Sequence, residues 1–243
     1  MRRKNYIYAY YQGIKDGSIV VGRWVKLVYE YLVTGLESKA FKFDQKKANA
    51  AIEWIEAHCF HTEGPLAPGP LRLELWQKAL ISAIFGIVDD KGNRQFREVL
   101  LVVARKNGKS LLAAAIADYI FRVDGGYGSK VYCLAPKLDQ ADLCYSALEF
   151  NVHAEPELDA ITRSTKYRGL MIQETNTTIK KLAFSSKKSD GYNPMFFVAD
   201  EDLDIYPEGF GLEPISLKTH QETREEVSAA VADLKSILAA PEP

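Results

Sequence analysis

The chain has 243 residues, of which 47% are hydrophobic and 26% charged, and its formal net charge is −1. This length allows one large domain or two small ones, and the composition is that of an ordinary globular protein rather than a disordered or fibrous one. The balanced charge excludes a strongly basic surface as a sign of nucleic-acid binding.

Residues 5–60 are predicted to be helical, because apolar residues recur three and four positions apart. The three stretches with this pattern are residues 5–17, 23–36 and 44–60. Asp44 is a suitable N-cap for the third. Residues 64–70 contain three prolines and two glycines, which cannot continue a helix and mark a junction. We therefore predict a helical N-terminal subdomain at residues 1–70 and a second domain at residues 71–243.

Helices and strands alternate in the second part of the sequence. The predicted helices are residues 75–87, 111–121 and 138–150, and the predicted strands are residues 98–103, 130–136 and 195–201. Residues 89–93 read as a turn, and residues 169–185 as a hairpin that turns at residues 174–176. Strands that alternate with helices favour an α/β fold with a mostly parallel sheet flanked by helices, and we expect the strand at residues 98–103 to be buried on both faces.

The end of the sequence, residues 202–243, matches none of the motifs found earlier in the chain. Within it, residues 221–239 place four apolar side chains on one helical stripe, namely Val227, Val231, Leu234 and Leu238. This pattern predicts an amphipathic helix that needs a partner, in this chain or in another.

Cysteine usage and hydropathy indicate the compartment. Cys59, Cys133 and Cys144 are too few and too scattered for a disulfide framework, which fits a reducing compartment. We assign His58 and Cys59 to a packed helix end rather than to a zinc site, because no second pair lies at ligand spacing. No apolar run reaches the roughly 18 residues of a membrane span, so we expect a cytoplasmic protein without membrane contact.

The loop before the predicted helix at residues 111–121 carries the clearest chemistry. It ends in Gly108, Lys109 and Ser110, and a strand, a tight turn ending Gly-Lys-Ser and a helix form the context of a phosphate-binding loop. Backbone N–H groups at the helix N-terminus would bind phosphate oxygens, Lys109 would reach the terminal phosphates, and Ser110 would join a Mg²⁺ shell. The first glycine of the usual spacing is replaced by Val103, and the alternative interpretation is an ordinary lysine at a helix start.

Two carboxylates and one arginine extend this interpretation. Asp200 and Glu201 end the predicted strand at residues 195–201, at the sheet edge where the loop also emerges. Asp200 would hold Mg²⁺, and Glu201 would polarise a water for attack on a γ-phosphate. Arg105, inside the loop, would offset charge on that phosphoryl group. An acidic loop and a surface arginine are the alternatives, but the order of the motifs favours a nucleotide hydrolase.

In these motifs the sequence resembles the large subunit of the tailed-bacteriophage terminases, the motor that packages viral DNA. VARKNGKS resembles that family's phosphate loop, which has an early arginine and often lacks the first glycine, and MFFVADE resembles its acidic motif. GSIVVGRWVKLVYEYL and the helix after it resemble the family's helical N-terminal region. LELWQKALI resembles its adenine-side motif, in which Gln77 would contact the base beside Trp76. The resemblance covers about residues 6–201.

The resemblance implies a P-loop ATPase fold that binds ATP and Mg²⁺. It implies Glu201 and Arg105 as catalytic residues, and Ser110 and Asp200 as Mg²⁺ partners. The ATP-binding residues that it implies are Trp76, Gln77, Arg105, Lys106, Asn107, Gly108, Lys109 and Ser110. The partners that it implies are double-stranded DNA, a portal protein and a small terminase subunit, with a homo-oligomeric ring on the portal in the host cell cytoplasm.

The sequence after Glu201 departs from the family. Neither the coupling motif nor the C-terminal nuclease domain is recognisable there, so the chain resembles the ATPase portion alone and nuclease activity is not expected. ATP binding is therefore a firmer expectation than rapid hydrolysis. Two alternatives stay open: an ATP-binding interaction or assembly module that does not hydrolyse ATP, and another P-loop NTPase that acts on nucleic acid.

Overall fold

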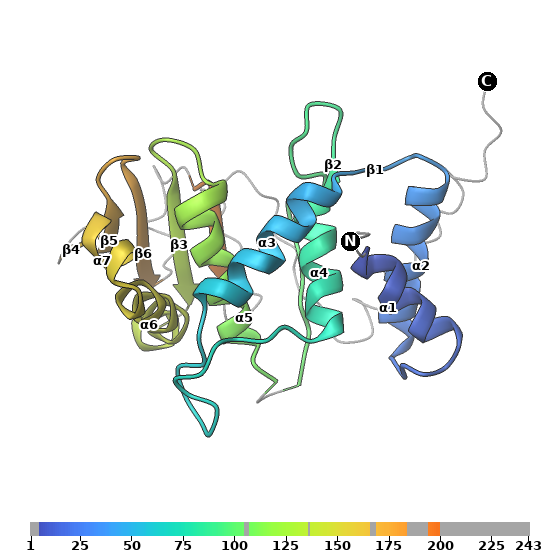
Figure 1. The fold of residues 1–243 in the computed structure, drawn as a ribbon, viewed down its shortest axis with the longest axis horizontal. Coiled ribbons are helices and arrows are strands. Elements are labelled where there is room, and N and C mark those ends of the chain that lie inside the picture. Colours follow the sequence, from blue (N-terminus) through green and yellow to red (C-terminus); the bar gives the residue numbers. More distant parts are fainter. Residues whose placement is uncertain (1–4, 105–106, 136, 166–168, 184–193, 200–243) are drawn as a thin grey trace.

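The computed structural model of the chain consists mainly of α-helices and a five-stranded sheet (Figure 1). The sheet lies on one side of the molecule, α1 and α2 lie on the other, and α3, α4 and α5 lie between. The structure describes residues 5–104, 107–135, 137–165, 169–183 and 194–199. The predicted amphipathic helix at residues 221–239 lies outside the described residues.

The N-terminal helices form where the sequence predicts them. Asp44 caps α3 as expected, since its side chain accepts hydrogen bonds from the backbone N–H groups of Lys46 and Lys47. Asn5 caps α1 in the same way. The helices are α1 (Tyr6–Lys15), α2 (Arg23–Glu37), α3 (Gln45–His58) and α4 (Leu75–Gly86).

Helix α4 joins two hydrophobic cores. Its side chains Ile81 and Phe85 belong to the larger core with α3, α5 and the sheet, whereas Ala79 and Ala83 belong to the smaller core with α1 and α2. A helix that is apolar on all sides is buried on all sides, and α4 follows this rule. The predicted boundary at residue 70 stays a prediction; α4, on its far side, packs against α3 and α1.

A small antiparallel ladder covers the top of α4. It pairs β1 (Lys42–Phe43) with β2 (Ile87–Val88). The predicted turn follows β2, where the Asp89 side chain accepts hydrogen bonds from the N–H groups of Lys91 and Asn93.

The main sheet is mixed, which corrects the expectation of a mostly parallel sheet. Its described strands run in the order β4-β5-β6-β3-β7, and β3 pairs in parallel with both β6 and β7. The predicted hairpin is present as β5 and β6, but it continues into an unpredicted edge strand, β4, so two of the four described pairings are antiparallel. The strands are β3 (Lys130–Ala135), β4 (Thr162–Thr165), β5 (Gly169–Ile172), β6 (Thr177–Ala183) and β7 (Phe196–Ala199).

The remaining helices pack beside the sheet. Helix α5 (Lys109–Tyr119) contacts β7, α6 and α3, and continues directly into a π-helical turn, η1 (Ile120–Asp124). Helix α6 (Leu138–Ala154) contacts β3 and β6, and it is followed at once by the short α7 (Pro156–Ile161). Both longer helices were predicted, whereas the π-helical turn and α7 were not.

The predicted buried strand at residues 98–103 is wrong. These residues have no assigned secondary structure and pair with no strand in the described chain, and Val99, Leu100 and Val102 are 48%, 51% and 77% exposed. An apolar run becomes a buried strand only when a neighbouring strand satisfies its backbone, and the described pairings give β7 only β3 as a neighbour. The strand β7 is accordingly half-buried rather than fully enclosed.

Candidate functional site

In the described part of the predicted phosphate loop, the glycine has a left-handed backbone conformation. Gly108 has a φ of 69°, in the left-handed region, and is the residue that caps α5. The N–H of Leu112 donates to the Gly108 carbonyl over 2.9 Å, so the helix starts immediately. The Asn107 side chain donates to the Ala104 carbonyl over 3.0 Å and folds the loop back on itself.

The start of α5 is suited to an anion. The cap residue, Gly108, has no side chain to bond the first N–H groups, and the first turn of the helix contains no acidic residue. The first N–H groups of a helix lack intrahelical acceptors and carry the positive end of the helix dipole. Lys109 and Ser110 are the first two residues of α5, so an ammonium and a hydroxyl accompany these N–H groups. Such a helix start binds phosphate oxygens readily.

The residues expected on the adenine side lie at the start of α4. Gln77 is almost buried, and its side-chain Oε1 accepts a hydrogen bond from the Glu74 N–H over 2.8 Å, as one half of a capping box. Trp76 is half-buried and packs against both hydrophobic cores. Helices α4 and α5 both begin at the lower end of the molecule in Figure 1. The structure therefore brings the two predicted parts of the site to the same end.

The remaining predicted site residues lie outside the described residues. They are Arg105, Lys106, Asp200 and Glu201. Their placement follows only from their neighbours in the chain: β7 ends at Ala199, which stands opposite Leu134 near the carboxyl end of β3. Among the described residues, no group of three His, Cys, Asp or Glu side chains could hold a metal ion.

A buried ion pair that sequence reasoning missed lies further along the helix that carries the loop. Arg122 and Asp118 form two hydrogen bonds, with the Nε–Oδ1 distance at 2.5 Å, and their side chains are 3% and 0% exposed. The end of α3 contacts both members: the Arg122 guanidinium lies 5.2 Å from the Trp54 ring centroid, and the Cys59 thiol donates to Asp118 over 3.9 Å. The spacing i, i+4 of an acid and an arginine in an Ala-rich helix was the available signal.

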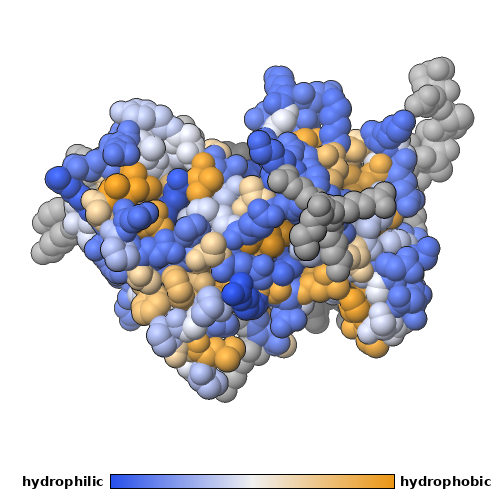
Figure 2. Space-filling view, viewed as in Figure 1, coloured by the Kyte–Doolittle hydropathy of each residue, from blue (hydrophilic) through white to orange (hydrophobic). Residues whose placement is uncertain are grey.

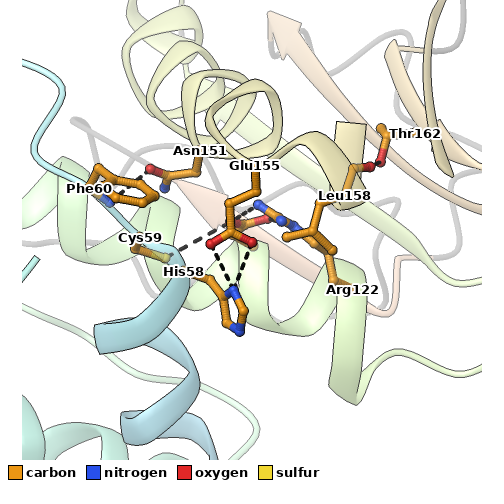
Figure 3. A network of polar contacts seen from close by, with 9 residues as sticks. His58, Cys59, Phe60, Arg122, Asn151, Glu155, Leu158 and Thr162 are labelled. Carbon is orange, nitrogen blue, oxygen red and sulfur yellow. Dashed lines mark hydrogen bonds and ion pairs between the residues drawn. The ribbon is translucent and has the colours of Figure 1, made fainter. Parts of the chain in front are cut away.

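A second group of polar contacts ties the same end of α3 to α6 and α7 (Figure 3). His58 Nδ1 lies 2.8 Å from a carboxylate oxygen of Glu155, which stands between α6 and α7. The N–H of Phe60 donates to Asn151 of α6 over 3.0 Å. Thus His58 and Cys59 serve helix packing, as expected from the sequence, and in addition join three helices.

Burial dominates the electrostatics of this cluster. Removal from water raises the pKa of Asp118 to about 6, although the adjacent Arg122 guanidinium favours the charged carboxylate. Burial also raises the pKa of the Cys59 thiol, and the negative charge of Asp118 adds to that effect. The cysteine is therefore an unreactive thiol, not a nucleophile.

The flanks of the phosphate loop are joined by one ion pair. Arg94, in the segment that leads to the loop, lies 3.5 Å from a carboxylate oxygen of Asp124, the last residue of η1. The guanidinium also lies 5.7 Å from the ring centroid of Phe85 in α4. This contact attaches the far end of the α5–η1 helix to the chain before the loop.

Apart from the predicted site residues, the described residues form a surface groove. The face in Figure 2 is mainly hydrophilic, and its apolar areas are small and separate. One shallow groove lies on α6 beside the loop before α4, and none of the predicted site residues lines it. Its lining residues are Thr62, Glu63, Asp139, Asp142, Leu143, Ser146, Ala147 and Phe150. In the described part of the chain, no helix is long and apolar enough to cross a membrane.

Comparison with known proteins gives a consistent result. The family model of the terminase large subunit, ATPase domain, matches residues 75–209. The large terminase subunit of Enterobacteria phage HK97 is 26% identical over 157 residues, which are 64% of this chain and 30% of that protein. The crystal structure of the HK97 large terminase matches with a TM-score of 0.55 and 25% identity, over 65% of this chain and 32% of the other. The chain thus spans about a third of the length of each relative.

Proposed function

The chain belongs to the terminase large subunit ATPase domain family, and from this premise we propose that it is the ATPase motor portion of a viral DNA-packaging terminase. In this role it hydrolyses ATP to drive double-stranded DNA into a procapsid. The observation that carries the proposal is the start of α5, where left-handed Gly108 precedes Lys109 and Ser110 inside the matched residues. That helix start offers N–H groups, an ammonium and a hydroxyl to a polyphosphate.

The phosphates of ATP bind at this helix start. The N–H groups of residues 108–110 approach the phosphate oxygens, and Lys109 reaches the terminal phosphates. Arg105, Lys106 and Asn107 complete the loop, with Arg105 placed to offset charge that develops during phosphoryl transfer. The hydrogen bond from Asn107 to the Ala104 carbonyl supports a loop that is folded before nucleotide arrives.

The divalent ion and the attacking water belong to the same edge of the sheet. The Ser110 hydroxyl and the Asp200 carboxylate are oxygen ligands of the kind that Mg²⁺ prefers. When bound, Mg²⁺ neutralises charge on the phosphate oxygens. Glu201, one residue further, accepts a proton from the water that attacks the γ-phosphate. The position of β7, which ends at Ala199 beside the carboxyl end of β3, supports this assignment.

The base of the nucleotide lies against the start of α4. Because the Gln77 Oε1 already accepts a hydrogen bond from the Glu74 N–H, the side-chain NH₂ remains to donate to a ring nitrogen of adenine. Trp76 supplies the aromatic surface beside it. This arrangement makes Gln77 a donor to the base, a role that a glutamate cannot replace.

The partners follow from the family. We infer that the chain acts on double-stranded DNA together with a portal protein and a small terminase subunit, as a homo-oligomeric ring in the host cell cytoplasm. A role in DNA packaging is supported by the family match and by the relatives from phage HK97.

A second candidate is an ATP-binding assembly module that does not turn ATP over quickly. The observation that favours it is the exposed segment at residues 98–103, which pairs with no strand in the described chain. A phosphate loop whose preceding segment is not paired in a sheet can bind nucleotide without holding the reacting atoms in line.

One experiment separates these functions. We would measure Mg²⁺-dependent ATP binding and turnover of the chain, with and without double-stranded DNA, for the unchanged protein, Lys109→Ala and Glu201→Gln. The motor predicts no binding by Lys109→Ala, and binding without turnover by Glu201→Gln. Binding without turnover by the unchanged chain supports the assembly module. Unchanged ATP affinity of Lys109→Ala would disprove the phosphate-loop assignment.

A further inference from the structure

Helix α5, which follows the proposed phosphate loop, is rich in alanine. Its sequence KSLLAAAIADY contains four alanines, and apolar side chains are distributed on all its faces. Small side chains interdigitate weakly, so they leave the rotation and axial shift of a helix poorly determined. Leu112, Ile116 and Tyr119 of α5 do pack into the core, and a directional polar contact would add to this packing in fixing how the start of α5 points.

The Arg122–Asp118 pair supplies that constraint. Both side chains are excluded from water, and a planar guanidinium with two hydrogen bonds to one carboxylate allows a single relative geometry. The pair also reaches outside its own helix, to the Trp54 ring and the Cys59 thiol of the α3 end. A rotation of α5 would separate the charges from these partners.

The end of α3 is itself attached to α6 and to Glu155, which lies between α6 and α7. His58 pairs with Glu155, and the N–H of Phe60 donates to Asn151, so α3 cannot follow a movement of α5 without breaking contacts to α6 and α7. In Figure 3 the two sets of contacts converge on the residues at the end of α3. The buried pair is thus anchored to a second, independent set of elements.

The polar cluster around Arg122 contains buried donors that are not hydrogen-bonded within the described part of the chain, which favours a role in positioning α5 over a role in stability. Arg122 Nη1 and Asn151 Nδ2 are buried donors without an acceptor among the described residues. A buried ion pair with an unsatisfied donor adds little net stability compared with apolar side chains of the same size, so the cluster fits a role in specifying geometry better than a role in stability.

We propose that Arg122 is a positioning residue for the phosphate loop: with Asp118 it fixes α5 against the end of α3, and so directs the helix start at the phosphates. This inference rests on the proposed function for its effect on ATP, but not for its effect on the helix. Misplacement of a catalytic loop by about 1 Å lowers turnover by roughly 100-fold, whereas ground-state binding by N–H groups and a flexible lysine tolerates it better.

The test uses Asp118→Leu/Arg122→Met, which removes both charges at similar volume and avoids leaving one buried charge alone. Arg122→Lys keeps the charge but loses the planar fork. The matched control is Glu56→Gln/Lys78→Met, which removes a 3.0 Å ion pair between α3 and α4. The other contacts given for this pair are to the Leu73 N–H and the Tyr6 ring. The measurements are thermal unfolding, the KM and kcat for MgATP, and amide hydrogen exchange of residues 109–112.

The expected result is a double variant that unfolds cooperatively and keeps the KM for MgATP within about threefold, but loses at least about tenfold in kcat. Exchange of the amides at the α5 start rises at least severalfold, Arg122→Lys is intermediate, and the control changes neither. Wild-type exchange and kcat in the double variant would overturn the proposal. If the unchanged chain neither binds nor hydrolyses ATP, the proposed function fails, and the hydrogen exchange alone decides the positioning role.

Discussion

On the amino-terminal side of Gly108, residues 98–103 are apolar yet largely exposed and pair with no strand in the described chain; on its carboxyl-terminal side, α5 is buried against α3, α6 and β7. Both flanks are hydrophobic in sequence. They differ in how backbone polar groups are satisfied, since a helix bonds to itself whereas a strand needs a neighbour. The position of the phosphate loop is therefore determined in this structure by the helix that follows it.

The substitution expected to destabilise the buried, carboxyl-terminal flank most is Arg122→Ala. It leaves the Asp118 carboxylate buried without its counterion, at a site with no exposure. We expect a loss of about 3–5 kcal/mol in the free energy of unfolding, enough to unfold a marginal domain. Urea unfolding followed by circular dichroism measures it. A loss as small as that of an exposed pair would show that the carboxylate is protonated or hydrated in the folded protein.

A matched pair of substitutions compares the flanks directly. Leu112→Ala on α5 removes a fully buried side chain, with an expected loss of roughly 2–4 kcal/mol. Val102→Ala on the other flank removes a side chain that is 77% exposed, with an expected change of about 0.5 kcal/mol or less. Denaturant unfolding of both variants gives the difference. Equal losses would mean that residues 98–103 are packed in solution.

The pH dependence of stability sharpens the comparison, because the buried flank contains Asp118, a carboxyl with a raised pKa. The pKa of Asp118 is raised to about 6 in the folded chain, so the folded state binds more protons than the unfolded state between roughly pH 4 and 6. The contribution of Asp118 to stability is therefore present at low pH and is lost as the pH rises through about 6. Thermal unfolding at pH 5 and 7 tests this, and Asp118→Asn should remove that part of the slope.

A small effect on stability is expected at Gly108, at the boundary between the flanks. Gly108→Ala meets no atom within 4 Å of the new Cβ, so its cost is that of the left-handed φ alone, about 1 kcal/mol. Nucleotide affinity should fall more than stability, because the loop would move away from the phosphates. Isothermal titration with MgATP and thermal unfolding give both numbers. Unchanged affinity would separate Gly108 from the phosphate site.

Local signals in the sequence account for the part of the fold that was predicted. Helical periodicity and the cap at Asp44 gave α1 to α4, and the hairpin β5–β6 and the strand β7 formed as expected. The failures are non-local. An apolar run predicts a strand at residues 98–103 but says nothing about whether a neighbour pairs with it, and the edge strand β4 depends on the hairpin that it joins.

In the candidate site, too, the local features were predicted from the sequence and the non-local contacts were not. The residue types and spacing of Gly108, Lys109 and Ser110 were readable from the sequence, and the structure places them at a helix start. The roles of Asp200 and Glu201 stay predictions. The cluster around Arg122 was missed because its partners Trp54 and Cys59 lie more than fifty positions earlier in the chain, and only the folded molecule brings them together.

The ion pair between Arg94 and Asp124 joins the two ends of the segment at residues 94–124. The segment between these two residues contains the whole phosphate loop and its helix, and its ends are joined like a closed ring. The entropy cost of bringing the two ends of a segment together grows only slowly with its length. One ion pair can therefore help to keep the ends of this segment in contact. Such a segment tends to open as one cooperative unit. A displacement of the chain before the loop should therefore be transmitted to the end of η1 through the Arg94–Asp124 ion pair, and not through the bound nucleotide.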